Sequence, residues 1–130
     1  MAFFSTRTDY SVILLRALAR SKGFISLRII AKNNRLPYRY VSRLAGDLKK
    51  AGILKSREGV LGGYALAKKP KDIRLIEVIE LMDGPMAPSR CTATPGTCPR
   101  EAFCTLKPHW TTMHRKIHAQ VSTYTLASIT

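Results

Sequence analysis

A helical pattern that runs directly into a glycine-rich hairpin constrains this chain more than any other feature. Between positions 37 and 52, apolar residues recur every three or four positions, which predicts a helix with one buried face. These residues are Val41, Leu44, Ala45 and Leu48. The pattern begins at Pro37, a residue favoured in a first helical turn, and stops at Gly52 after two lysines. The next segment, ILKSREGVLGGYAL, has short apolar runs at 53–55 and 64–66 around three glycines, which predicts a β-hairpin.

Two further helices are expected before this one. Thr8 or Asp9 can cap a helix that runs to about Arg20, and Ser26 can cap a shorter helix through Asn34. A short helix, a connection and a second helix with a basic outer face, followed by a hairpin, are typical of a winged helix-turn-helix. We therefore predict a mainly α fold with a small β-hairpin wing.

The charge is concentrated in the first half of the chain. Residues 1–70 carry 15 Lys/Arg against three Asp/Glu, a net of +12, whereas residues 71–130 carry seven against five, a net of +2. The basic residues are spread over short amphipathic segments, so the pattern favours nucleic acid over a membrane as the partner. No apolar run approaches the roughly 18 to 20 residues of a membrane span, and the first residues lack the order of a signal peptide. We expect a cytoplasmic protein without a membrane partner.

The second half predicts an apolar fourth helix, over about 73–82, and a long C-terminal helix. In the last helix apolar residues recur at spacings of three and four. They are Trp110, Met113, Ile117, Val121 and Tyr124. Little chain remains to cover this stripe, so we expect a homodimer in which a second copy covers it, with packing on the chain's own first helix as the alternative. The predicted units are a DNA-binding domain at 1–85, a cysteine loop at 86–105 and a dimerisation helix at 106–130.

All three cysteines, Cys91, Cys98 and Cys104, lie in the stretch CTATPGTCPREAFC. Thiols stay reduced in the cytoplasm, so this clustering favours a metal or redox role over a disulfide. The spacing lacks the close cysteine pair typical of structural zinc. The surrounding Thr, Pro, Gly and Arg residues also differ from the apolar segments in which structural thiols usually lie.

Four features in order, LPYRYVSRL, SREGVLGGY, a helix ending in MDG and the three-cysteine loop, resemble the iron-sulfur winged-helix transcription regulators of the IscR/NsrR type. The resemblance covers nearly the whole chain. It implies a homodimer that binds double-stranded operator DNA, as a repressor, with an affinity controlled by an iron-sulfur cluster that senses nitric oxide, iron or redox state. It also implies that the three cysteines are cluster ligands, with [4Fe-4S] favoured and [2Fe-2S] as the alternative.

The fourth cluster ligand is less constrained by the sequence. IscR-like relatives have a histidine three positions after the last cysteine, where this chain has Lys107. NsrR-like relatives use an aspartate near the N-terminus of the other subunit, which the resemblance matches to Asp9. We favour Asp9, whose alternative role is a helix cap, and retain His109 as the second candidate. His114 and His118, one turn apart, are more typical of a solvated helix face than of a metal site.

The DNA contacts are expected mainly at the start of the third helix. The candidates there are Tyr38, Arg39, Tyr40, Ser42 and Arg43. Arg39 and Arg43 lie one turn apart and can reach guanine or phosphate from one face, while Tyr40 has core packing as an alternative role. Ser26, with the first amides of its helix, and Arg28 are candidate phosphate contacts.

The wing is expected to contact DNA through Arg57, in the minor groove, and through Gly62 and Gly63, which let the backbone approach closely. Relatives often have an arginine just before the first wing glycine, whereas this chain has Glu58, which changes how the wing can dock. Two other functions stay open: a metal-free thiol sensor with the same fold, and an iron-sulfur redox or carrier protein with an acidic partner. We predict no enzymatic activity, because neither a nucleophile-base pair nor a nucleotide-binding loop is present.

Overall fold

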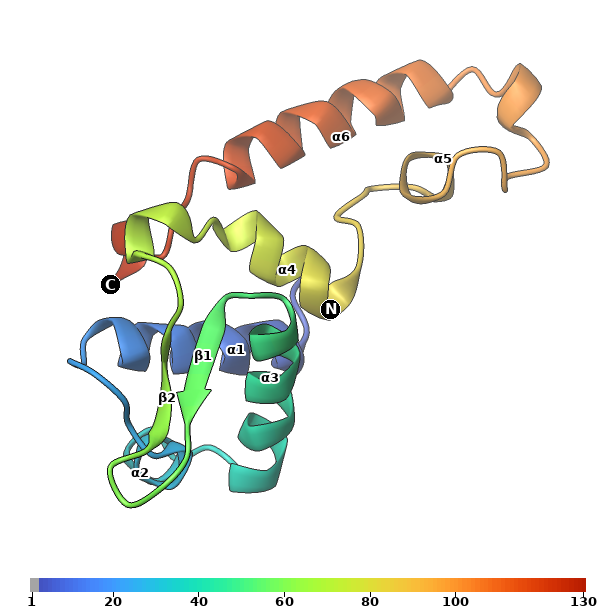
Figure 1. The fold of residues 1–130 in the computed structure, drawn as a ribbon. Coiled ribbons are helices and arrows are strands. Elements are labelled where there is room, and N and C mark those ends of the chain that lie inside the picture. The colour runs from blue at the N-terminus through green and yellow to red at the C-terminus, as the bar shows by residue number, and fades with distance from the viewer. Residues whose placement is uncertain (1–2) are drawn as a thin grey trace.

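The first half of the chain forms three helices and a two-stranded antiparallel hairpin around one core (Figure 1). The computed structural model describes residues 3–130. The elements of this half are α1 (Thr6–Ala19), α2 (Leu27–Asn33), α3 (Tyr38–Lys50), β1 (Leu54–Arg57) and β2 (Gly63–Leu66). The predicted mainly α fold with a small β-hairpin is confirmed, with boundaries that differ by a few residues.

The predicted start of the first helix is wrong. Ser5, not Thr8 or Asp9, is the N-cap of α1, and its hydroxyl accepts a hydrogen bond from the Thr8 amide at 3.4 Å. Ser5 is itself a favoured capping residue, and it is fixed in place by bonds to Asp83. Asp9 therefore lies inside the first helical turn, with its side chain exposed.

The paired helices follow the sequence pattern closely. Ser26 caps α2 as predicted, and the four periodic apolar residues of α3 are all buried. They meet Leu14 and Leu15 of α1, both 0% exposed, in the main core cluster. Burying side chains of this size stabilises the fold by roughly 1.5–3 kcal/mol each. We call the elements that share this cluster, within residues 5–83, the head of the molecule.

The hairpin is fastened to the segment before α2. Tyr64 and Ile25 exchange two backbone hydrogen bonds, at 2.9 and 3.0 Å. Gly63 makes this contact possible, because its φ is +135° and a Cβ there would overlap the backbone of Ile25. The hairpin is thus fixed against the segment that leads into α2.

The fourth helix, α4 (Leu75–Asp83), begins two residues later than the predicted start, after the short 3₁₀ helix η1 (Pro70–Asp72). It packs against α1 and ends at Gly84, whose φ is +81°. Its inner residues belong to two clusters. Val78 and Met82 face the main core, whereas Ile76 and Ile79 pack with Met86 and with the C-terminal helix.

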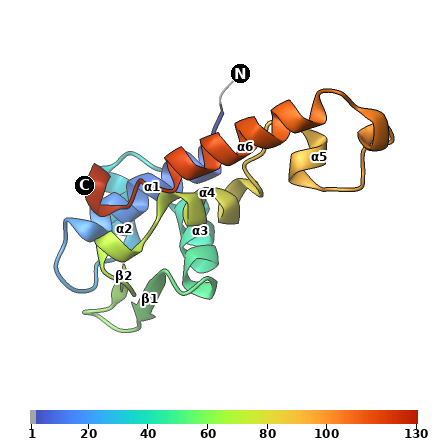
Figure 2. The same ribbon diagram turned by 90° about the horizontal axis from the view of Figure 1, so that it is seen from above.

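The second half contains short helical turns and one long helix, α6 (Lys107–Val121), which crosses α4 (Figures 1 and 2). The turns are α5 (Arg90–Ala93), η2 (Glu101–Phe103) and η3 (Ala127–Ile129). The expectation that the long helix continues to Tyr124 is wrong. The chain leaves α6 at Val121 and returns to the head, where the Leu126 amide donates to the Ile73 carbonyl at 2.8 Å and its side chain is 0% exposed.

The apolar stripe of α6 is partly covered by the same chain. Ile117 and Val121 pack, together with Met86, against Ile76 and Ile79 of α4. The cluster that they form contains no residue of α1. Met113 stays 44% exposed, so the stripe is left open toward the beginning of α6. No helix within residues 3–130 combines the length and the apolar content needed to cross a bilayer. The division into units at 85 and 105 stays a prediction.

Candidate functional site

The predicted DNA contacts converge at one end of the head. Figure 1 shows the first turn of α3, the α2 region and the tip of the β1–β2 hairpin at the same lower edge, away from α6. A surface hollow of about 380 Å³ connects them. Its lining includes Ser26, Tyr38, Ser42, Gly59, Gly62 and Gly63. Residues from three separate segments therefore form one continuous surface, which we call the reading face.

The two arginines of α3 are available for an external partner. Arg39 and Arg43 are exposed, and neither forms an ion pair within residues 3–130. Ser42 between them is half-buried. Tyr40 instead faces inward: its ring packs edge-to-face on Tyr10 of α1, with centroids 5.7 Å apart. The packing role of Tyr40 is thus the one that the structure displays.

The start of α2 is joined to the start of α3. The Arg28 guanidinium lies over the Tyr38 ring, 4.2 Å from its centroid. The Ser26 hydroxyl accepts from the Arg28 amide at 3.3 Å, so it caps its own helix. A cation stacked on an aromatic ring is held in a defined position, and Arg28 thereby keeps a fixed place on the reading face.

The wing arginine is held at the end of β1, beside the turn, where Arg57 pairs with Gly63. The Arg57 guanidinium lies 4.4 Å from the Phe24 ring centroid, and its Nη2 donates to the Leu61 carbonyl at 2.9 Å. Lys55 lies over the same ring at 5.7 Å. Gly62 is also required by packing, since a Cβ there would overlap the Arg57 carbonyl oxygen. Arg57 therefore braces the hairpin, whereas the sequence suggested a side chain extended into the minor groove.

The three cysteines lie on the segment that projects beyond the head (Figure 2). All three are free and half-buried, and no side chain from 87 to 106 is buried. Cys91, on α5, is 3.3 Å from the Ser89 hydroxyl. Within residues 3–130, no three His, Cys, Asp or Glu side chains are placed as ligands of one metal ion. A single chain thus carries the thiols without closing them around a common point.

Polar contacts give this cysteine loop its shape. The Glu101 carboxylate accepts from the Gly96 amide at 2.7 Å and pairs with the Lys107 ammonium at 2.9 Å. The hydrogen bond from Lys107, followed by that from Gly96, lowers the pKa of Glu101. The same bond raises the pKa of Lys107. Through Glu101, the loop is therefore tied to the start of α6.

The chain matches the model of the Rrf2 family, described as iron-dependent transcriptional regulators, over residues 4–130. The chain belongs to the Rrf2 family. It is 31% identical to protein rrf2 of Nitratidesulfovibrio vulgaris over 127 residues, which cover 96% of this chain and 85% of that one. This Rrf2 protein is accordingly a DNA-binding transcription regulator.

Solved structures of winged-helix relatives match nearly the whole Rrf2 chain. CymR, the global cysteine regulator of Bacillus subtilis, superposes with a TM-score of 0.79 at 26% identity, covering 99% of this chain and 96% of that one. IscR of T. potens superposes with a TM-score of 0.75 at 30% identity, covering 96% and 83%. The likeness extends through the cysteine loop and α6, so the winged-helix head and the second half form one shared architecture.

The two candidates for a fourth ligand lie on different elements. Asp9 is exposed in the first turn of α1, and His109 is exposed near the start of α6. His118 pairs with Glu80 at 3.3 Å, which ties α6 to α4 and gives this histidine a structural partner. His114, one turn away, has a buried Nδ1 without a hydrogen-bond partner within residues 3–130.

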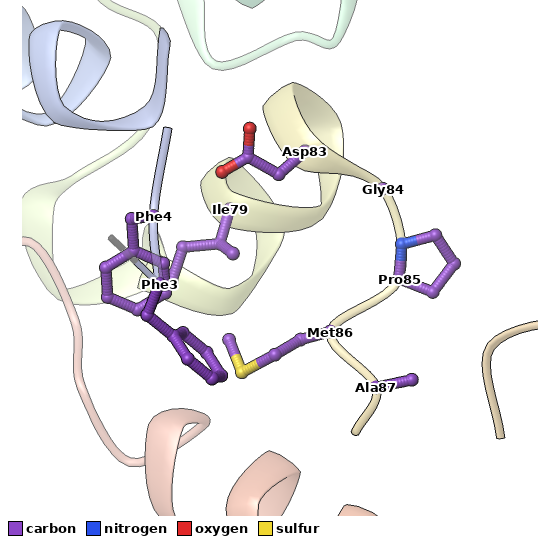
Figure 3. A pocket seen from close by; sticks show the side chains of 8 residues that line it. All are labelled: Phe3, Phe4, Ile79, Asp83, Gly84, Pro85, Met86 and Ala87. Carbon is purple, nitrogen blue, oxygen red and sulfur yellow. The ribbon is translucent and has the colours of Figure 1, made fainter. Parts of the chain in front are cut away.

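Asp83 is the main residue that the sequence interpretation missed. Its carboxylate accepts from the Ser5 amide at 3.1 Å, from the Ser5 hydroxyl and from the Thr8 hydroxyl at 2.7 Å. Burial would raise the pKa of Asp83, but these bonds and the Arg7 charge together lower it. Figure 3 shows Asp83 at the end of α4, where Gly84 leads toward the cysteine loop. The MDG sequence was the available signal, although it pointed to no role.

Proposed function

We propose that this Rrf2 protein is a homodimeric, sequence-specific repressor whose affinity for operator DNA is set by an iron-sulfur cluster at Cys91, Cys98 and Cys104. One observation carries the proposal: a loop with three free thiols and no buried side chain is attached to the well-packed head of a transcription regulator. A segment without a core of its own has little to fix its shape. A bound group can therefore set that shape and transmit its presence to the head.

The donor set fits an iron-sulfur cluster. Thiolates are soft ligands that suit iron, and half-buried sulfur atoms on a loop can turn toward a common centre. Closing the loop around a cluster disturbs only local polar contacts, such as the pair of Thr94 and Thr97 hydroxyls 3.0 Å apart. The bound cluster would supply an iron centre that reacts with small oxidants or nitric oxide. A carboxylate as the fourth ligand, which we propose for Asp9, favours [4Fe-4S] over [2Fe-2S].

Asp9 is the preferred fourth ligand, contributed by the other subunit. Its alternative role as a helix cap is filled by Ser5, and its carboxylate is exposed, with no ion pair within residues 3–130. Asp83 fixes the turn that carries Asp9 to the end of α4, next to the cysteine loop. Arg7, in the same turn, pairs with Asp47 of α3 at 3.5 Å. A change at the cluster would thus reach α3 through a short chain of bonds, with His109 as the alternative ligand.

The dimer is proposed to form along the open side of α6. Its beginning and the adjoining segments leave large apolar side chains in solvent that the same chain does not cover. These residues are Phe3, Phe103, Leu106 and Met113. A two-fold partner would cover them. Half-sites on one side of B-DNA lie about 34 Å apart, which is the separation that the two reading faces of such a dimer must match.

Arg39 and Arg43 are proposed to read base edges in the major groove, while Ser26, Arg28 and the wing glycines contact the sugar-phosphate backbone. A good bidentate arginine contact is worth about 1–3 kcal/mol of discrimination. Arg43→Ala should therefore weaken binding to a selected operator duplex by roughly 5- to 150-fold, with the iron content unchanged. Lys71→Ala is the charge-matched control, because Lys71 lies on η1, away from the reading face. Equal loss in both variants, or in neither, would reject this assignment.

Anaerobic purification tests the cluster. The wild-type protein should contain iron and sulfide and absorb visible light, and Cys98→Ser should lose all three signals. Thr97→Ala changes the neighbouring residue without removing a thiol and should keep them. Asp9→Asn should change the spectrum or the reaction with nitric oxide, unlike Asp72→Asn. If His109→Ala has that effect instead, the fourth ligand is His109.

The metal-free thiol sensor is the second candidate. It is favoured by three free, half-buried thiols on one short loop, where an oxidant could join two of them. On this alternative, anaerobic protein is colourless, and a mild oxidant both forms a disulfide in the loop and changes DNA affinity. The same purification therefore separates the two sensing mechanisms.

A further inference from the structure

The tip of the wing carries two adjacent apolar side chains directed into solvent. Val60 is fully exposed and Leu61 is 80% exposed, which makes them the most exposed large aliphatic residues described in the structure. A hairpin turn normally has polar or glycine residues at such positions. An adjacent apolar pair held in water at the end of a projecting element requires an explanation from binding rather than from folding.

The turn that presents this pair is rigid. The Gly62 amide donates to the Gly59 carbonyl at 3.0 Å, and Arg57 clamps the Leu61 carbonyl at 2.9 Å. The close backbone approach at Gly62 admits no side chain. Because these bonds use backbone groups, they fix the direction of the Val60 and Leu61 side chains without covering them.

The charged side chains of the wing do not replace this pair at the tip. Arg57, the last residue of β1 before the turn, is stacked on Phe24 and held by the Leu61 carbonyl. Glu58, the next residue, is exposed and negatively charged, so it is repelled by phosphates. The side chains that project farthest from the turn, those of Val60 and Leu61, are therefore apolar.

The position of the tip determines its partner. Val60 lines the same hollow as Ser26, Tyr38 and Ser42, so the tip is continuous with the reading face. When the start of α3 enters a major groove, an element beside it at the same end of the molecule meets the flanking minor groove. Minor-groove proteins use apolar side chains as wedges that partly separate base steps and bend the duplex.

We infer that Val60 and Leu61 form an apolar wedge that enters the minor groove beside each half-site and selects DNA sequences that open easily. This inference rests on the proposed reading face and adds a specificity determinant to it. The floor of the groove must present no guanine amino group against the wedge, which favours A·T pairs. The negative potential of a narrow A-tract repels Glu58, so flexible steps such as TA are preferred to rigid A-tracts.

The probe is a duplex that the wild-type protein of 130 residues selects from a random-sequence library. The double variant Val60→Ser, Leu61→Ser should bind this duplex about tenfold more weakly, the loss expected when two partly buried aliphatic contacts are removed. It should also lose the preference for flexible A·T steps in the flank and bend the duplex less. An apolar contact releases no counterion, so the dependence of affinity on salt should stay as in the wild type.

Two comparisons isolate the wedge. Leu81→Ser removes another exposed leucine, on α4, and should leave affinity and flank preference unchanged. For the wild-type protein, exchanging flank A·T pairs for inosine·C keeps the minor-groove pattern and should be tolerated, whereas G·C should weaken binding.

Unchanged affinity and flank preference in the double variant would overturn the wedge. An equal loss on every flank sequence, or a shallower salt dependence, would also overturn it. In all these cases the wild-type protein still selects a sequence, and Arg43→Ala still weakens its binding. Failure of the reading face itself looks different, because the wild-type protein then selects no preferred sequence at all.

Discussion

The head and the cysteine loop of this Rrf2 protein differ in what holds them together. In the head, side chains such as Leu14, Leu44 and Leu48 are at most 1% exposed, and they join helices far apart in the sequence. In the loop no side chain is buried, and its shape depends on local polar contacts around Glu101 and Thr94. The head is thus fixed by its own core, whereas the loop is held only by local polar contacts, which is why we propose that a bound cluster sets its shape.

The largest expected effect contrasts core and loop directly. Leu44→Ala leaves a cavity between α3 and α1 and should lower the free energy of unfolding by about 2–5 kcal/mol. Thr105→Ala shortens an exposed side chain of the loop that lies outside the proposed dimer contact, and should change it by less than about 0.5 kcal/mol. Chemical denaturation of the cluster-free protein measures both. Similar losses would mean that the loop has a core of its own.

A pair of glycines sharpens the contrast at the level of the backbone. Gly63 and Gly96 have φ of +135° and +85°, but only at Gly63 would a Cβ overlap a neighbour, the backbone of Ile25. Gly63→Ala should cost about 2–4 kcal/mol and disrupt the wing, whereas Gly96→Ala should cost about 1 kcal/mol, the strain of the left-handed conformation alone. Thermal melting compares them, and equal shifts would contradict the fixed contact of the wing with Ile25.

Asp83, which joins the two regions, gives a pH-dependent effect. Its pKa in the folded protein lies below the ordinary value of 3.8, so its stabilisation is present above that value and is lost as the pH falls through the folded pKa. Asp83→Asn should lower the free energy of unfolding at neutral pH by about 1 kcal/mol, a modest figure because the carboxylate is exposed. The difference from wild type should shrink below about pH 4. Asp72→Asn serves as the control, and a difference independent of pH would exclude the carboxylate as the cause.

The smallest effect is local to the loop. Glu101→Ala removes the acceptor of the Gly96 amide and the partner of Lys107. The global free energy of unfolding should stay unchanged, while amide hydrogen exchange from 94 to 101 becomes faster because these bonds constrain only the loop. If the amides from 94 to 101 exchange at the same rates in the variant and in the wild type, Glu101 does not brace the loop.

The same difference explains what the sequence could predict. Periodic apolar residues predicted α3 and its buried face, because burial of Val41 and Leu44 follows from the spacing alone. The hairpin was also predicted from a local pattern, two short apolar runs on either side of three glycines. The inward packing of Tyr40, the clamp of Arg57 on Phe24 and the bonds of Asp83 depend on contacts between distant segments, which no local pattern encodes. The true cap, Ser5, was missed because its position is fixed from α4, 78 residues away.

The packing of α6 and the course of the chain after it could not be predicted from the local sequence pattern either. The sequence predicted the apolar stripe on α6, but its cover was assigned to a second copy, with the chain's own first helix as the alternative. The structure shows that α4 covers Ile117 and Val121, and that Leu126 returns to the head. In the cysteine loop the spacing of thiols indicates their chemistry, while the arrangement of the sulfur atoms depends on what they bind.

The central claim is that the state of the cysteine loop controls how the head binds DNA. The most direct measurement is the affinity of one anaerobic protein preparation for its selected duplex, at one salt concentration, before and after its iron is removed. Coupling of about 1–3 kcal/mol predicts a change of roughly 5- to 150-fold, and this change should disappear in Cys98→Ser. Identical affinities of the two forms, or protein that holds no iron when isolated without air, would contradict the account.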